Sequence, residues 1–243
     1  MCGRFVSTSS AADLADHFGA VPPEGPGPEP RYNVAPTDDV LVVRGVEGAR
    51  RVEAFHWGLV PWWAEDPKVG SRMINARAET LATKGAFKAA FAERRVLVPA
   101  DGFYEWAALE GTKRKQAYFV HRPDAEPYAF AGLWEQWRGR DRDGSDHLRS
   151  TTIVTTVANG VMSAIHDRMP VVLPRSSWDE WLDPAHDDLA ALGRLLVPAP
   201  DELTVLRPVG PEVGNVRNDS PALVDEVVPQ APVDEPTLPG LDA

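Results

Sequence analysis

At 243 residues, 43% hydrophobic and 25% charged, the chain has the composition of a soluble globular protein of one domain, or two at most. Its single cysteine excludes an intrachain disulfide and a thiolate metal cluster; no apolar run approaches the roughly 18 residues of a membrane-spanning helix and no signal peptide is recognisable, so we expect a cytoplasmic protein that engages no membrane. A formal net charge of −11 argues against a nucleic-acid binder, unless the acids are unevenly distributed.

Most of the predicted elements are short strands, and helices are fewer. A serine cap and a terminal glycine predict a helix over 9–19, followed by a stiff, proline-rich loop at 22–30. In chain order, the remaining predictions are strands at 38–45 and 51–58, helices at 74–83 and 85–95, strands at 94–100, 117–121, 128–134 and 150–157, helices at 176–182 and 186–196, and a strand at 203–209. Strands and helices do not alternate regularly, which favours an α+β fold with a largely antiparallel sheet.

The negative charge is concentrated toward the C-terminus. Residues 219–243 hold six acids and no base, and residues 174–202 carry a net charge of −5, so the remaining chain is neutral overall. A local basic patch is therefore compatible with the sequence. We expect the folded domain to span 1–225 and the acidic, proline-rich segment 226–243 to be a disordered tail whose partner is unknown.

The one cysteine, Cys2, directly follows Met1 in MCGRF. Methionine aminopeptidases usually remove a methionine that precedes a small residue, which would leave Cys2 with a free α-amine beside its thiol. An α-amine has a reference pKa of about 7.7–8.0, so part of it is uncharged near neutral pH. Such a 1,2-aminothiol can form an imine with an aldehyde and then close a thiazolidine ring. Gly3 permits close approach of a ligand and Arg4 adds a cation that would favour thiolate, although Cys2 could also be a small residue in a strand.

Three further segments place polar residues where chemistry could use them. In SRMINARAET, Asn75 and Arg77 lie close together, and Asn75 could orient a substrate or cap a helix. In ADGFYEW, Glu105 lies among aromatics, where it could transfer protons or simply face outward from a strand. In IHDRMP, His166 could serve as an acid or base, or be a satisfied loop histidine.

Two adjacent tryptophans, Trp62 and Trp63, follow a proline in HWGLVPWWA. Because neighbouring strand residues face opposite ways, we do not expect both to be buried. Exposed aromatics suit stacking on bases, worth roughly 1–3 kcal/mol per base. Basic residues gather in the same neighbourhoods as the motifs: Arg4, Lys68, Arg72, Arg77, Lys84, Lys88, Arg94, Arg95, Arg168 and Arg217.

Seven motifs in order, MCGRF, RYNVAPT, HWGLVPWWA, INARAET, ADGFYEW, IHDRMP and VGNVRND, resemble those of the SOS-response-associated peptidase family, the SRAP domain. The resemblance spans residue 1 to about 225. It implies a single domain with a curved, barrel-like antiparallel sheet, flanking helices and a basic groove for DNA. It also implies a monomer, without metal or cofactor, that senses abasic sites in single-stranded DNA at replication forks during the DNA damage response.

The resemblance further implies roles for individual residues. Cys2 would capture the aldehyde of the ring-opened abasic sugar as a thiazolidine crosslink, in lyase-like chemistry. Asn75 would position the cysteine and the sugar, Glu105 would shuttle protons, and His166 would donate a proton to the sugar oxygen. Contacts to phosphates and flanking bases are implied for Arg4, Trp62, Trp63, Arg77, Trp106 and Arg168. Peptide hydrolysis, which the family name records, could use the same pocket and ranks below crosslinking.

Two other interpretations stay open on the sequence alone. N-terminal nucleophile glutamine amidotransferases also begin Met-Cys-Gly, but they need an Asn-Gly oxyanion segment, and the one Asn-Gly here, Asn159–Gly160, lacks such surroundings. A non-covalent DNA-binding module would bind abasic DNA as durably without Cys2. The acidic tail and the 174–202 segment depart from the family pattern, so binding should depend on the covalent bond and local contacts and should fall with salt.

Overall fold

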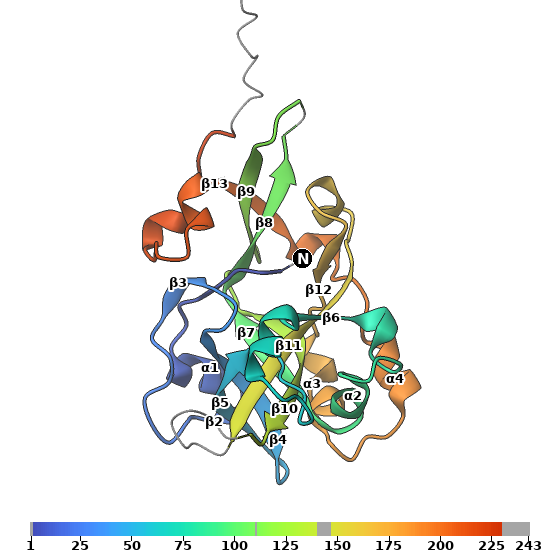
Figure 1. The fold of residues 1–243 in the computed structure, drawn as a ribbon. Coiled ribbons are helices and arrows are strands. Elements are labelled where there is room, and N and C mark those ends of the chain that lie inside the picture. The colour runs from blue at the N-terminus through green and yellow to red at the C-terminus, as the bar shows by residue number, and fades with distance from the viewer. Residues whose placement is uncertain (1, 110, 140–146, 230–243) are drawn as a thin grey trace, which may run out of the picture.

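Strands dominate the structure, a computed structural model that describes residues 2–109, 111–139 and 147–229 (Figure 1). The strands are β1 (Phe5–Ser7), β2 (Ala20–Val21), β3 (Arg31–Val34), β4 (Asp39–Val46), β5 (Ala49–Trp57), β6 (Asn75–Arg77), β7 (Arg95–Ala100), β8 (Gly102–Ala108), β9 (Lys115–His121), β10 (Tyr128–Trp137), β11 (Leu148–Val157), β12 (Arg168–Pro170) and β13 (Val205–Val209). The α-helices are α1 (Ala11–Phe18), α2 (Lys88–Glu93), α3 (Trp178–Leu182) and α4 (Leu189–Arg194). Within these ranges, no helix has both the length and the apolar character needed to cross a membrane. The predicted tail lies outside the described residues from 230 onward.

Two sheets organise these strands. The larger has the order β12-β11-β10-β7-β4-β5-β2, with β6 added against β11. A parallel pairing of β5 with β11, at His56 with Ser150 and Trp57 with Thr151, closes β4, β5, β11, β10 and β7 into a ring. The smaller sheet has the order β13-β9-β8-β1-β3 and is antiparallel throughout. The predicted α+β fold with a barrel-like sheet is confirmed, and the barrel is mixed rather than purely antiparallel.

Alternate residues of the barrel strands serve two buried clusters, because successive strand side chains point to opposite faces. Val43 and Leu97 pack with the residues of helices α1 to α4 that face the barrel. Val42 and Val96 instead pack with Phe103 of β8 and with Cys2. The second cluster therefore joins the barrel to the smaller sheet, and Cys2 lies within it.

Helix α1 has the two ends that its sequence predicts. Ser10 caps the N-terminus: its side chain accepts a hydrogen bond from the backbone N–H of Asp13, and Asp13 reciprocates in a capping box. Gly19 ends the helix in the left-handed conformation, at φ 59°, which glycine adopts without steric cost. The helix predicted over 9–19 is confirmed, and the segment 22–30 is a loop as expected.

The predicted helix at 74–83 is wrong. Its first part is strand β6, which pairs in parallel with β11 at Asn75 opposite Ile153, and Ala78–Thr80 forms a single 3₁₀ turn. Ala76 at the centre of β6 is completely buried. The spacing of the apolar residues suits a helix, but pairing with an existing barrel strand satisfies the backbone and buries Ala76 as well, so tertiary pairing overrides local propensity.

Candidate active site

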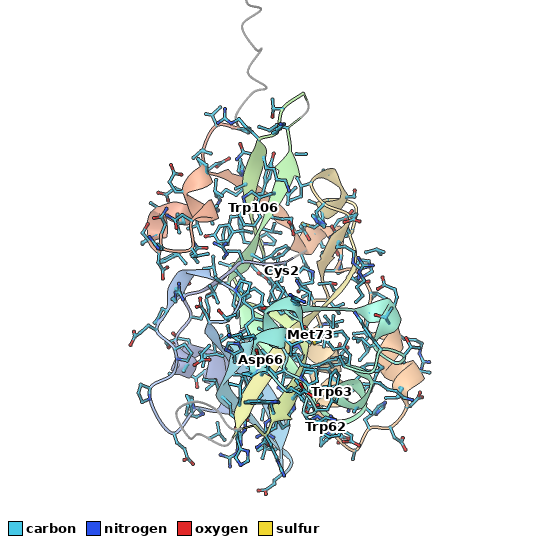
Figure 2. The ribbon with its side chains drawn as sticks, in the orientation of Figure 1. Cys2, Trp62, Trp63, Asp66, Met73 and Trp106 are labelled. Atoms are coloured by element: carbon cyan, nitrogen blue, oxygen red, sulfur yellow. The ribbon has the colours of Figure 1, made fainter. Side chains whose placement is uncertain are left out.

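Cys2 lies where the two sheets meet (Figure 2). Its side chain is fully buried, and Phe5 beside it packs edge-on against Trp57 with ring centroids 5.0 Å apart. The segment is held to β8 by antiparallel pairing, in which the backbone N–H of Tyr104 donates to the carbonyl of Arg4 over 2.9 Å. The start of the chain is thus a fixed part of the core cluster.

Asn75 touches Cys2 directly. Its Nδ2 donates to the Cys2 carbonyl over 2.7 Å. The preceding carbonyl, of Ile74, accepts from Trp57 Nε1 over 3.0 Å and from the backbone N–H of Ile153 over 3.1 Å, which fixes the start of β6. The Oδ1 atom of Asn75 is buried and accepts no hydrogen bond from the part of the chain that the structure describes. Because buried polar atoms normally have a partner, this oxygen is an acceptor available to a ligand.

Glu105 approaches Cys2 from β8. The register of β1 on β8 pairs Phe5 with Phe103, and continued two residues outward it places Gly3 opposite Glu105. Gly3 has no side chain to fill this position, and Glu105 is only 5% exposed. Burial first, and the negative charge of Glu105 second, raise the pKa of the Cys2 thiol to about 12. In the chain that retains Met1, the raised pKa favours the neutral thiol, and the carboxylate of Glu105 beside it is a potential proton acceptor.

The expectation that the Arg4 cation would favour thiolate is wrong. The Arg4 guanidinium points away from the thiol: Nη1 donates to Asn33 Oδ1 over 2.9 Å and to the carbonyl of Val213 over 3.0 Å. Only the backbone N–H of Arg4 interacts with the Cys2 sulfur, and its lowering effect on the thiol pKa is smaller than the effects of burial and Glu105. Although Arg4 is close to Cys2 in sequence, its side chain points toward Asn33 on β3 and its charge does not reach the sulfur.

His166 lies on the connection between β11 and β12. Met162 and Met169 on either side of it belong to the same buried cluster as Cys2, so this connection packs beside the site. Its Nδ1 accepts from the backbone N–H of Arg168 over 2.9 Å and also lies 3.0 Å from an oxygen of Asp167. The two contacts demand opposite protonation of Nδ1. The side chain of Asp167 is 87% exposed, so its contact is largely open to solvent, whereas the bond from the backbone N–H of Arg168 needs Nδ1 as an acceptor.

The two tryptophans are both exposed, Trp62 by 62% and Trp63 by 54%, which confirms that they are not both buried. They lie in the turn after β5, and Figure 2 shows them well apart from Cys2, on the side opposite Trp106. Trp106 is half-buried on β8, next to Glu105, and Arg77 is exposed at the end of β6. Exposed or half-buried tryptophans therefore lie on both sides of Cys2.

Arg168 is held by protein partners. Its guanidinium binds both carboxylate oxygens of Glu79, over 2.6 and 3.1 Å, and the carbonyl of Thr155 over 2.7 Å. The hydrogen bond from Arg168 lowers the pKa of Glu79. The side chain of Arg168 is only 11% exposed. Its predicted contact with DNA stays a prediction, and its visible role is to pin the end of β6 to the β11–β12 region.

Neither a metal centre nor an oxyanion segment accompanies the cysteine in the described residues. No group of three histidine, cysteine or acidic side chains there could hold a metal ion. Asn159, of the Asn-Gly pair, is buried: its Nδ2 donates to the carbonyl of Ala199 and to Thr204 Oγ1, and its Oδ1 accepts from the backbone N–H of Met162. Its amide is wholly committed to local structure, which does not support the amidotransferase interpretation.

The sequence reasoning missed Asn33. It is completely buried on β3, and its amide bonds to Arg4 and to the chain beyond Val213. The motif RYNVAPT could have indicated it, because Asn33 is a polar residue between the strand-forming residues Tyr32 and Val34.

The fold and the site define a class: proteins in which a cysteine at the start of the chain lies between a small barrel and a second sheet, beside an asparagine and a glutamate. The family model described as SOS response associated peptidase (SRAP) matches residues 1–216. The chain therefore belongs to the SRAP family, as its seven motifs predict.

Curated relatives and solved structures agree with this assignment. The abasic site processing protein YoqW of Bacillus subtilis is 38% identical over 227 residues, covering 93% of this chain and 99% of the relative. YedK of Escherichia coli is 34% identical, with 93% and 100% covered, and HMCES of Pongo abelii is 31% identical, with 82% and 66% covered. A crystal structure from Bacteroides thetaiotaomicron has a TM-score of 0.81 at 22% identity, covering 93% of this chain and all of that one. A phage-related protein from Bordetella bronchiseptica has a TM-score of 0.67 at 31% identity, with 86% and 94% covered.

Proposed function

We propose that this protein processes abasic sites in single-stranded DNA by capturing their aldehyde on Cys2, after removal of Met1, as a thiazolidine crosslink in the DNA damage response. The observation that carries the proposal is the arrangement around Cys2: Asn75 holds its carbonyl and offers a free Oδ1, while Glu105 lies beside its thiol. The relatives named above as abasic site processing proteins support the choice of substrate.

The order of bond formation follows from the state of the thiol. The uncharged α-amine of Cys2 attacks C1′ of the open-chain sugar, and the resulting carbinolamine loses one water to give an imine. The thiol then adds to the imine carbon, a base takes its proton, and the ring nitrogen gains a proton. The net reaction joins protein to DNA and releases one water. Because burial and Glu105 keep the thiol protonated, the amine acts first.

The neighbouring residues take distinct roles in this scheme. Glu105 is the base that receives the thiol proton and transfers it during imine formation and reversal. Asn75 Oδ1 accepts a hydrogen bond from the amine or the sugar, and His166 donates from Nε2 to the sugar oxygen as the ring opens. Trp62, Trp63, Trp106 and Arg77 would contact bases and phosphates beside the lesion. The protein would act as a monomer in the cytoplasm, at replication forks on the nucleoid.

Peptide hydrolysis would need the thiol itself as the attacking group. With the thiol pKa raised to about 12, the thiolate fraction near neutral pH is very small, because the charge of the N-terminal amine only partly offsets burial and the charge of Glu105. An aldehyde reaction that begins at the amine avoids this difficulty. Crosslinking is therefore the better supported function of the same residues.

Intact-mass analysis tests the proposal. The purified protein should already lack Met1, and after mixing with an oligonucleotide that carries one abasic site it should gain the mass of the oligonucleotide less one water. Cys2→Ala should form no denaturant-stable product while plain strand binding largely survives. An N-terminal tag that blocks the α-amine should abolish the product as well. A crosslink formed normally by the tagged protein would show that the ring chemistry is wrong.

A further inference from the structure

Two motifs have no role in the proposed chemistry, yet the fold places them side by side. RYNVAPT contributes β3, and VGNVRND follows β13 near the end of the domain. Arg31 Nε donates to Asp219 over 2.9 Å, and the same carboxylate accepts from the backbone N–H of Tyr32 over 2.7 Å. We call this contact between residues 31–33 and 213–219 the clasp.

Asn33 is the centre of the clasp. Its side chain is completely buried. Its Nδ2 points at three carbonyls of the C-terminal segment, those of Val213, Asn215 and Asn218, over 3.3, 3.1 and 2.8 Å. Its Oδ1 accepts from Arg4 Nη1 over 2.9 Å. An amide has two N–H donors, so these contacts use its donor capacity fully and leave it no direct part in chemistry.

Arg4 connects the clasp to the nucleophile. Its Nη1 is shared between Asn33 and the carbonyl of Val213, and burial lowers the pKa of the guanidinium. The backbone of the same residue touches the site: its N–H interacts with the Cys2 sulfur, and its carbonyl accepts from Tyr104 on β8. Holding the Arg4 side chain in place therefore also holds its backbone N–H, which interacts with the Cys2 sulfur.

We propose that Asn33 is a positioning residue for Cys2, acting through Arg4, and that the segment 213–219 is thereby part of the site. Cys2 is then held from two sides, by Asn75 at its carbonyl and by the clasp through Arg4. Ring closure requires the amine and the thiol of one residue to reach the same carbon, so a loosely held terminus would lose rate rather than affinity. This role in catalysis rests on the proposed function.

The single cysteine makes the position of Cys2 measurable without DNA. Alkylation by iodoacetamide reports only on its thiol, which the native structure buries. We would compare full-length, Met1-processed wild type with Asn33→Leu and Arg4→Met. Arg4→Met leaves the bonds from Asn33 to the three carbonyls in place, so it tests the connection even if Asn33→Leu fails to fold. Gln116→Leu is the matched control, because Gln116 is also a buried amide bonded to two carbonyls, those of Ala117 and Val209.

We expect Asn33→Leu and Arg4→Met to alkylate roughly tenfold faster at pH 8 and to crosslink abasic single-stranded DNA roughly tenfold more slowly at saturation. The DNA concentration for half-maximal rate should change less than about twofold. Gln116→Leu should match wild type in both assays despite a similar loss of Tm. If Asn33→Leu and Arg4→Met are alkylated at the wild-type rate, the proposal is overturned. A raised half-saturation concentration alone in Arg4→Met would instead make Arg4 a phosphate contact.

The two assays separate this inference from the proposed function. If wild type forms no crosslink at all, the proposed function fails, whereas the alkylation rates still show whether Asn33 and Arg4 hold Cys2. If wild type crosslinks and the variants alkylate slowly, the function stands and the positioning role is wrong.

Discussion

The thiol of Cys2 is a poor nucleophile by itself, since burial and the carboxylate of Glu105 keep it protonated at neutral pH. In the proposed mechanism, the same carboxylate takes the proton once the sulfur adds to an imine. One acidic residue would thus suppress the free thiolate and assist the step in which the thiol is needed. The raised pKa fits a residue whose amine reacts first.

Glu105→Gln separates these two effects. Removing the negative charge should lower the pKa of the thiol, so alkylation of Cys2 at a fixed pH between 8 and 10 should become faster. Loss of the proton acceptor should slow crosslinking at saturating DNA by about 100-fold. Stopped-flow alkylation and gel-based crosslinking rates check the two directions. Faster alkylation with undiminished crosslinking would mean that Glu105 has no part in proton transfer.

At the level of elements, the site depends on short strands added to the barrel. Strand β6 has three residues, and its parallel pairing with β11 delivers Asn75 to the carbonyl of Cys2. Arg168 reinforces the far end of β6 by binding Glu79. Elements so short have little stability of their own, so their geometry comes from the barrel to which they pair.

Arg95 joins the helices to the same barrel. It is 3% exposed at the start of β7 and donates to five carbonyls: those of Phe91 and Ala92 in α2, Trp181 in α3, and Asp183 and His186 in the segment after α3. Arg95→Met leaves these carbonyls without their donor and should cost about 3–5 kcal/mol in the free energy of unfolding, measured with urea. Arg149→Met, which breaks a surface ion pair with Glu53, is the control and should cost at most about 1 kcal/mol. A similar loss in both variants would contradict this role for Arg95.

For the whole molecule, the proposed function requires a chain with a net charge of −11 to approach DNA. The excess of negative charge lies in 174–202 and 219–243, whereas exposed Arg77 and the two exposed tryptophans lie within the motifs. Local contacts and a covalent bond can hold a DNA strand that the electrostatic field of the net negative charge repels. The field then affects how fast DNA arrives more than how firmly it is held.

Ending the chain after residue 229 tests this charge effect. The deletion removes Asp234, Glu235 and Asp242 and changes the net charge from −11 to −8. The association rate with single-stranded DNA at low salt should rise about two- to fivefold, and the difference should vanish near 1 M salt, where the Debye length is about 3 Å. The crosslinking rate at saturation should not change. A full-length chain with these acids replaced by amides should behave like the deletion; if neither alters the low-salt rate, the tail does not oppose DNA approach.

The sequence by itself determined the family, the α+β class, most barrel strands and the identity of the residues around Cys2, because these follow from strand patterns, turn residues and ordered motifs. It determined the ends of α1 for the same reason, since caps are local chemistry. Each of these features depends on residues that are neighbours along the chain.

Only the tertiary structure decided where the charges and amides point. Arg4 is two residues from Cys2 in sequence but binds Asn33, 29 residues away, and Asn75 lies on a strand where the spacing of its segment suggested a helix. The end of the domain closes on its beginning through Asn33 and Asp219. Such contacts join segments distant in sequence, and their geometry is set by strand pairing across the two sheets, which no local pattern encodes.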